Sequence, residues 1–166
     1  MFENLSETDL AYLAGFIDGE GSIHISIQHE EWFQPIISVS NSHKETMGWI
    51  SSVLGAKCVY QYDKRPESGN WKSMYLASIT GQRKILRLLQ LIHPYLKTKK
   101  VQAELMMAFC ELRLEERMCN PKSGYTQDDI EIYERLCALN KRGNPKIAET
   151  VTAGFGKEKE YKVIRA

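Results

Sequence analysis

The strongest constraint on the fold of this chain is an apolar helix pattern close to its N-terminus. Leu10, Leu13, Ala14 and Ile17 recur at the spacing that places side chains on one face of an α-helix. Ser6 precedes this segment and an acid follows it three residues later, which is a capping pattern typical of a helix start. A pair of glycines then ends the pattern. The sequence therefore predicts a helix that packs one apolar face against a core.

The same helix carries a strip of residues with very small side chains. Such a strip would let two copies of the helix approach each other backbone to backbone. The acid at the end of the segment, Glu20, would then lie beside its counterpart, and two carboxylates at one point favour a divalent cation. The alternative is a tightly packed core helix with an exposed terminal glutamate. The residues predicted to line the contact between two copies are Leu13, Ala14, Gly15 and Asp18.

The rest of the chain predicts an α+β domain built from antiparallel hairpins. Residues 22–28 alternate apolar and polar side chains with period two, which is typical of a strand with one buried face. The same reasoning predicts a strand around 37–40, a helix over 42–54, strand-like runs over 57–65 and 71–79, and helices over 81–93, 98–118 and 128–140. The order is thus helix, two strands, helix, two strands and further helices.

The strands predict a polar surface that suits nucleic acid. On the first hairpin the side chains alternating with the core positions can donate and accept hydrogen bonds, and a two-stranded ribbon fits a major groove. On the later strands, Val59, Met74 and Leu76 are interpreted as core positions. The alternative is an ordinary solvated sheet face. The residues predicted to contact DNA from this surface are His24, Ser26, Gln28, Glu30, Gln34, Ser38, Ser40, Tyr60, Tyr62, Lys64, Ser73 and Tyr75.

The net charge of +1 conceals an uneven distribution of charged residues. Residues 1–43 contain seven acids and no lysine or arginine, whereas residues 44–109 contain eleven basic and four acidic residues. Residues 141–166 form a second basic block with a net charge of +4. Both blocks could neutralise phosphates, although solvated charged faces would explain the pattern equally well.

Several classes of protein and site are disfavoured by the sequence. No apolar run approaches the ~20 residues that a membrane span requires, so no membrane partner is expected. The acidic residues 1–9 resemble neither a signal peptide nor a transit peptide. The four cysteines are widely scattered, which favours free thiols over a zinc site or disulfides.

Residues 13–20 read Leu-Ala-Gly-Phe-Ile-Asp-Gly-Glu and resemble the signature of the LAGLIDADG homing endonucleases. The chain has one such motif, as in family members that work as homodimers. The resemblance implies the family's αββαββα core, with an antiparallel four-stranded saddle sheet and C-terminal helices. We expect a single endonuclease domain over residues 1–166, with a core over about 5–118 and C-terminal helices and a basic loop over 119–166.

The resemblance also implies an activity and its site. Two protomers would bind a long pseudo-palindromic double-stranded DNA site, and each would hydrolyse one phosphodiester, leaving short 3′ overhangs and promoting intron homing. Gly19 and Glu20 would bind Mg²⁺, for which Mn²⁺ or Ca²⁺ could substitute. Residues 94–103 resemble the segment that carries a basic residue near the active site, here Lys99, and His43 is a further catalytic candidate. A looser match over residues 140–146 implies phosphate contacts from Lys141, Arg142 and Lys146.

Two other functions remain open at this point. A maturase that assists group I intron splicing would bind RNA with the same fold, and a non-cleaving regulator would only bind DNA. Both predict loss of the catalytic acid or the lysine, whereas Glu20 and Lys99 are both present. An intron-encoded protein would be made where its target lies, in a chloroplast or mitochondrion or in a microbial cytoplasm or nucleoid.

Overall fold

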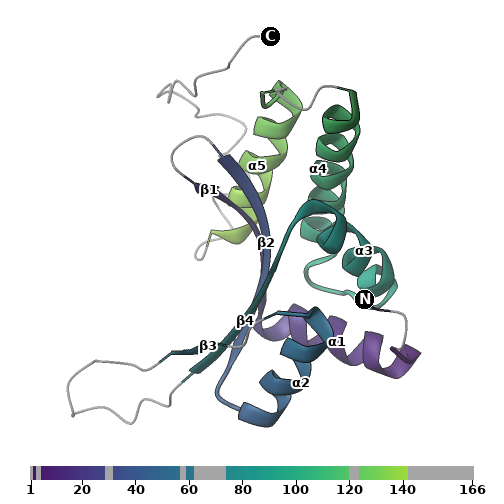
Figure 1. Cartoon of the computed structure of the whole chain (residues 1–166), viewed down its shortest axis with the longest axis vertical. Helices are drawn as coiled ribbons and strands as arrows, with labels where there is room; N and C mark the ends of the chain where they lie inside the picture. The colour runs from purple at the N-terminus through teal and green to yellow at the C-terminus, as the bar shows by residue number, and fades with distance from the viewer. Residues whose placement is uncertain are drawn as a thin grey trace, which may run out of the picture.

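The computed structural model describes residues 2, 5–28, 32–56, 59–61, 74–119 and 124–141 (Figure 1). The elements are α1 (Glu7–Glu20), β1 (Gly21–Gln28), β2 (Trp32–Asn41), α2 (Lys44–Leu54), β3 (Val59–Gln61), β4 (Met74–Thr80), α3 (Gln82–Ile92), η1 (His93–Tyr95), α4 (Lys100–Cys119) and α5 (Gln127–Asn140). This order confirms the predicted α+β class with an αββαββα core and C-terminal helices.

The helices begin and end where local chemistry favours it. The predicted cap of α1 is confirmed, because the Ser6 hydroxyl accepts from the Asp9 N–H and the Asp9 carboxylate accepts from the Ser6 N–H. Thr126 and Asp129 form the same reciprocal pair at α5. Helix α2 ends at Gly55, whose φ of 56° lies in the left-handed region that a residue without a Cβ adopts at little cost.

Four strands form one antiparallel sheet in the order β1-β2-β4-β3. Ile23, Ile37 and Ile79 lie opposite one another across β1, β2 and β4, and all three are buried. Helices α1–α4 contact this apolar face, whereas the opposite face is turned away from them (Figure 1). The period of two along each strand therefore separates a core face from an open face.

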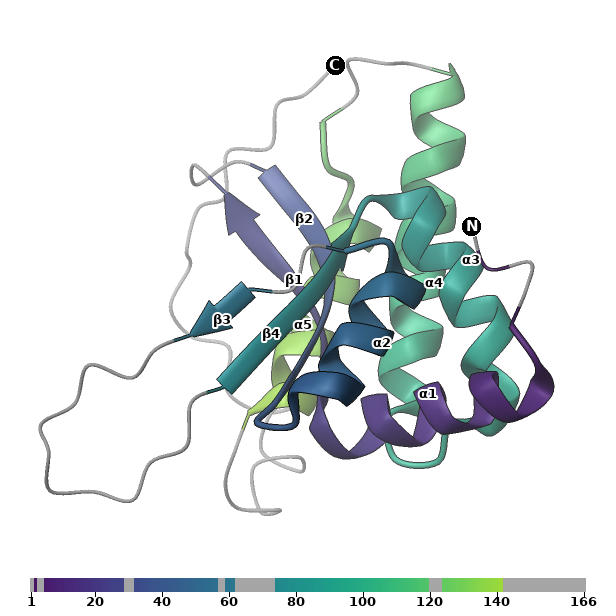
Figure 2. The same ribbon diagram turned by 60° about the horizontal axis from the view of Figure 1, so that its bottom comes forward.

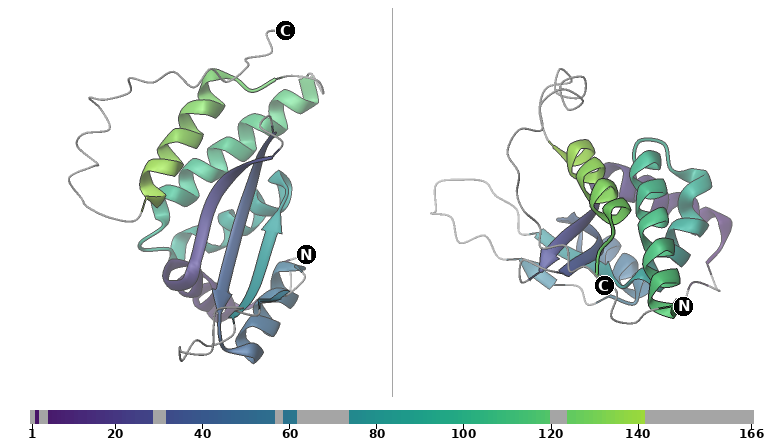
Figure 3. Two further views of the ribbon diagram at one scale, coloured as in Figure 1. Left: turned by 90° about the vertical axis from the view of Figure 1, so that its left-hand side faces the viewer. Right: turned by 90° about the horizontal axis from the view of Figure 1, so that it is seen from above.

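Helix α5 closes the edge of the sheet at β1. The two elements lie side by side, as the left panel of Figure 3 shows. The side-chain amide of Asn140 donates to the main-chain oxygen of Ile23 over 2.8 Å. An exposed edge strand offers unpaired backbone groups to other chains, and α5 covers part of this one.

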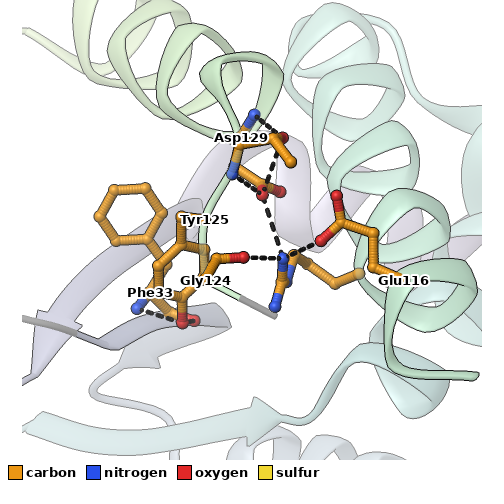
Figure 4. A network of polar contacts seen from close by, with 7 residues as sticks. Phe33, Glu116, Gly124, Tyr125 and Asp129 are labelled. Atoms are coloured by element: carbon orange, nitrogen blue, oxygen red, sulfur yellow. Dashed lines mark hydrogen bonds and ion pairs between the residues drawn. The ribbon is translucent and has the colours of Figure 1, made fainter. Parts of the chain in front are cut away.

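A buried polar network fastens α4 and α5 to the start of β2 (Figure 4). Arg113 of α4 donates to the Gly124 oxygen over 2.9 Å and to the carboxylate of Asp129 over 3.2 Å, and it also pairs with Glu116. The next residue, Tyr125, stacks on Phe33 and accepts a 2.8 Å hydrogen bond from its N–H. Burial of a polar group is costly unless the group is paired. These contacts pair the Arg113 guanidinium and Oδ2 of Asp129, although Oδ1 of Asp129 is buried without a partner among the described residues, and they favour one docking of α5.

The faces predicted for β4 are wrong by one residue. Ala77 and Ile79 are the buried positions, and Tyr75 shares their face and packs against the core. Met74 and Leu76 belong to the opposite, open face. The register of β4 against β2 places Ala77 opposite the buried Val39, so Ala77 lies on the core face. Successive side chains of a strand point to opposite faces, and an error of one residue in the prediction therefore exchanged the two faces of β4. Tyr75 is therefore removed from the predicted DNA surface.

Candidate active site and nucleic-acid interface

The chain turns from α1 into β1 without an intervening loop. The N–H of Gly21 donates to the oxygen of Ile17, and a Cβ at Gly21 would lie 2.6 Å from that oxygen. No other residue can make so close a turn, because Cβ atoms do not approach backbone oxygens to this distance. Gly19 and Glu20 are consequently exposed at the point where helix and sheet meet. The predicted metal ligands thus stand on a rigid junction.

Lys99 lies at this junction although it is distant in sequence. Its Nζ donates to the main-chain oxygen of Asp18 over 2.5 Å, and its side chain is half-buried. The amine is therefore held two residues before Glu20 in the chain. The structure thus places Lys99, the predicted basic residue, at the end of the helix that carries Glu20, the predicted carboxylate; their catalytic roles stay predictions.

The carboxylate of Asp18 is bound by backbone groups of its own chain. It accepts hydrogen bonds from the N–H groups of Lys97 over 2.6 Å, Thr98 over 3.2 Å and Lys99 over 2.9 Å. Partial burial would raise the pKa of Asp18, but these donors and the Thr98 hydroxyl together lower the pKa below its usual value. Asp18 is thus a charged anchor between α1 and the segment before α4.

The contact surface predicted for a second copy requires correction. Leu13 and Ala14 are fully buried in the core of the protomer, so neither side chain is available to another chain. The exposed positions on the other side of α1 are Ala11, Gly15 and Gly19, and a Cβ at either glycine would meet no described atom within 4 Å. Figure 2 shows α1 running along the outside of the molecule. The small-residue strip exists, but it is shifted around the helix because the apolar face points inward.

Three aromatic side chains flank this exposed strip. Tyr12 is 52% exposed and lies with its ring centroid 5.5 Å from Trp49 of α2 and 6.1 Å from Phe16. The Tyr12–Trp49 pair has an edge-on geometry, with an interplanar angle of 69°. The outer side of α1 therefore has no side chains at its glycines and is bordered by aromatic rings. Aromatic residues of this kind are enriched in the cores of protein interfaces.

His43 caps helix α2. Its Nδ1 accepts from the Thr46 N–H over 3.3 Å, and its Nε2 lies 3.2 Å from a carboxylate oxygen of Glu45. The side chain of Asn41 in turn accepts from the His43 N–H over 2.9 Å. These contacts explain the residue as a helix cap, and a catalytic role for His43 stays a prediction.

The open face of the sheet is polar and carries no formal charge within the described strands. His24 and Ser26 of β1 lie on it, as do Gln34 and Ser38 of β2. Burial lowers the pKa of His24, against a smaller opposing effect of Ser22, so its ring is neutral at pH 7. The described residues of this face are Ser22, His24, Ser26, Gln28, Trp32, Gln34, Ile36, Ser38, Ser40, Met74, Leu76, Ser78 and Thr80.

The sequence did not predict several residues of this open face. Ser78 and Thr80 are exposed beside the first hairpin, and only the register between β2 and β4 reveals them. Trp32 is 56% exposed opposite Gln28, at a position that resembles a loop in the sequence. Tyr60 of β3 pairs with Tyr75 of β4 in the sheet, and Lys141 is exposed after α5. The predicted contacts Glu30, Tyr62, Lys64, Ser73, Arg142 and Lys146 lie outside the described residues.

The predicted metal ligands at this site are all oxygen atoms, which suit a hard cation. Glu20 presents an exposed carboxylate and Gly19 an exposed main-chain oxygen, which suit Mg²⁺ or Ca²⁺ better than a softer metal. Among the described residues of one protomer, no three His, Cys, Asp or Glu side chains are grouped to hold a metal ion. The donor chemistry fits a divalent cation, and further ligands would have to come from outside this cluster. None of the described helices is long and apolar enough to span a membrane.

Comparisons with known proteins agree with this architecture. A family model described as LAGLIDADG endonuclease matches residues 13–110. The fold is similar to the archaeal intron-encoded homing endonuclease I-Vdi141I complexed with DNA, with a TM-score of 0.62 and 18% identity over 83% of this chain and 87% of that chain. It is also similar to the homing endonuclease I-CvuI in complex with its target in the presence of Ca, with a TM-score of 0.57 and 18% identity over 88% of this chain and 94% of that chain.

A third similar structure is that of the homing endonuclease I-TnaI, with a TM-score of 0.57 and 16% identity over 89% of this chain and 97% of that chain. No curated protein sequence gives a significant match. At these identities the solved structures establish a shared fold, and the family match covers more than half of the chain, including the second half of α1 and all four strands of the sheet.

Proposed function

Because this chain belongs to the LAGLIDADG endonuclease family, we propose that it is a site-specific homing endonuclease. It binds a long pseudo-palindromic double-stranded DNA site as a homodimer and hydrolyses one phosphodiester in each strand. The products carry short 3′ overhangs, and the break promotes homing of an intron.

The observation that carries this proposal is the junction of α1, β1 and the segment before α4. It combines an exposed carboxylate at Glu20 with an amine at Lys99 that is held to the main chain of Asp18. A carboxylate that binds a cation, beside an amine that stabilises negative charge, is a suitable pair for phosphodiester hydrolysis. A protein that only binds DNA has no need to hold an amine at this point.

Mg²⁺ is the proposed cofactor, bound by the Glu20 carboxylate and the Gly19 oxygen. When bound, it supplies Lewis-acid activation of water and neutralises charge on the phosphate. Because the close turn at Gly21 sets the direction in which the chain leaves α1, Glu20 would hold the cation where the helix meets the sheet. The amine of Lys99 lies near the same point and either stabilises charge or orients solvent.

The open sheet face is the proposed surface for DNA. Serine, glutamine and threonine side chains on it are short, uncharged and able to donate and accept hydrogen bonds, which suits the edges of bases in a major groove. Affinity then comes from basic residues at the periphery, such as Lys141, through contacts to phosphate. The exposed indole of Trp32 lies at the tip of the first hairpin, where it can reach beyond the strands.

The proposed homodimer forms through the outer side of α1. Gly15 and Gly19 allow close approach there, and the aromatic border of Tyr12, Phe16 and Trp49 supplies apolar area around them. Pairing of two such helices places the two Glu20 residues near the symmetry axis. Each protomer then cuts one of the two DNA strands, and the twofold symmetry of the dimer explains a near-symmetric target.

Cleavage is tested with the purified full chain and a plasmid that carries the uninterrupted copy of the gene hosting its reading frame. We expect linear plasmid with Mg²⁺ and none with EDTA. Glu20→Gln should bind the same DNA with unchanged affinity and fail to cut it, because the amide is a poor ligand for a hard cation. The matched control is Glu131→Gln, an exposed glutamate on α5, which should cut normally.

Tight binding without linearisation, with either Mg²⁺ or Mn²⁺, would contradict the nuclease and favour a regulator. Acceleration of group I intron splicing by a protein that does not cut would instead identify a maturase. Cutting by Glu20→Gln would refute Glu20 as the metal ligand while leaving the nuclease intact.

A further inference from the structure

Asp18 has a feature that neither the fold nor the proposed metal site explains. Both oxygens of its carboxylate are used, Oδ2 by the N–H groups of Lys97 and Thr98 and Oδ1 by the N–H of Lys99. All three donors come from one short segment that is about 80 residues away in the chain. A single side chain therefore binds every consecutive backbone donor of this segment.

The segment that Asp18 binds leads directly into α4. The N–H of Ala103 donates to the main-chain oxygen of Lys99 over 2.9 Å, so Lys99 is the N-cap residue of α4. The backbone donors at a helix start need acceptors, and an acidic side chain at Ncap usually provides one. Asp18 is not such a cap: it accepts from the N–H of Lys99 and of the two residues before it, and so couples the segment that leads into α4 to the end of α1.

Lys99 is bound to Asp18 twice. Its backbone N–H donates to the carboxylate, and its Nζ donates to the main-chain oxygen of the same residue. A lysine side chain is long and has several rotatable bonds, so a fixed backbone and a fixed amine together define where its charge lies. Without the carboxylate, the backbone of Lys99 would lose its anchor and the amine would lose its defined approach to the end of α1.

We propose that Asp18 is a positioning residue for the cleavage reaction, which holds the Lys99 amine at the end of α1, two residues before Glu20, by binding the backbone of residues 97–99. This role rests on the proposed function, because Lys99 matters for catalysis only if the chain cuts DNA. Asp18 itself touches no reacting atom. Its chemistry is that of an anion that three N–H groups recognise, so an amide in its place loses one acceptor oxygen and presents donors to donors.

The first test is a double-mutant cycle on the rate of single-turnover cleavage. Asp18→Asn should slow cleavage by about 10-fold to 100-fold while DNA affinity changes by less than about twofold, because misplacement of a reacting group lowers the rate and not ground-state binding. Lys99→Met removes the amine directly. The double variant should be no slower than Lys99→Met alone, because Asp18 acts through Lys99. Multiplied effects of the two substitutions would overturn the proposal.

Loss of these hydrogen bonds would also destabilise the protein, so a stability control is required. Ser6→Ala removes the side-chain cap of α1 without touching Lys99, and it should lower stability by about 1 kcal/mol while leaving the cleavage rate unchanged. A rate loss in Ser6→Ala equal to that of Asp18→Asn would overturn the positioning role. If Asp18→Asn does not fold, Thr98→Val takes its place: it removes the hydroxyl that donates to the main-chain oxygen of Asp18, which also accepts from the Lys99 amine, and an unchanged rate in Thr98→Val would contradict the proposal.

The second test does not depend on activity. Amide hydrogen exchange of residues 97–99, followed by NMR, should accelerate at least about tenfold in Asp18→Asn and remain slow in Ser6→Ala. Retained protection in Asp18→Asn would overturn the proposal whether or not the protein cuts. If the wild type binds DNA without cleaving it, only the proposed function is refuted. The exchange rates would then still decide whether Asp18 holds residues 97–99.

Discussion

The buried arginine of α4 offers the sharpest test of what holds the C-terminal helices to the sheet. The side chain of Arg113 is 4% exposed and that of Asp129 is 0% exposed. Arg113→Met keeps most of the aliphatic stem and removes the guanidinium, so its effect isolates the polar contacts of Figure 4 from the packing of the stem.

The size of the effect follows from what remains after the substitution. Removal of one partner from a buried ion pair costs about 3–5 kcal/mol, because the other charge is left uncompensated. Asp129 still accepts from the Thr126 N–H over 2.9 Å and from its hydroxyl over 3.1 Å, which offsets part of this cost. We therefore expect a loss of about 3 kcal/mol, or about 6–12 °C in Tm for a chain of this length.

The assay is equilibrium unfolding in urea, followed by circular dichroism, with the m-value compared between variants. Arg87→Met, on the exposed side of α3, is the matched control and should change stability by less than about 0.5 kcal/mol. The double variant Arg113→Met with Asp129→Asn should be more stable than Arg113→Met alone, since the buried charge is gone. A loss below about 1 kcal/mol in Arg113→Met, at an unchanged m-value, would refute the reasoning.

Three further predictions concern Gly15 of α1, Gly21 at the start of β1 and the buried thiol of Cys110. Gly15→Leu meets open space within the protomer and should fold normally, but sedimentation should show a monomer; a persistent dimer would exclude this side of α1 as the interface. Gly21→Ala should lose about 1–3 kcal/mol in urea unfolding, because its Cβ would lie 2.6 Å from the Ile17 oxygen; wild-type stability would contradict so tight a turn. Burial, with a smaller contribution from Glu111, raises the pKa of Cys110 to about 12. Native Cys110 should therefore resist iodoacetamide at pH 8 while the partly exposed Cys137 reacts, and its contribution to stability, present below the usual thiol pKa of about 8.5, should be lost as the pH rises towards 12.

Much of the site could be predicted because its parts are local in sequence. The helix start at Ser6, the apolar face through Ile17 and the acid at Glu20 depend on spacing within a few turns, and the structure has each where the spacing places it. The alternation of residues 22–28 likewise reveals both faces of β1, because adjacent side chains of a strand point in opposite directions. The pairing of Lys99 with the end of α1 was accessible only through a resemblance to a known family.

The choice between two faces of an element depended on how the elements pack together. The spacing of residues along α1 is enough to predict an apolar side and a small-residue side, but the packing of the sheet and helices placed Leu13 and Ala14 in the core and left Gly15 and Gly19 outside. The register of β4 against β2 turned Tyr75 inward. Asp18 contacts its partners across about 80 residues. Such contacts depend on how distant elements dock, and a periodicity of two or 3.6 residues describes one element at a time.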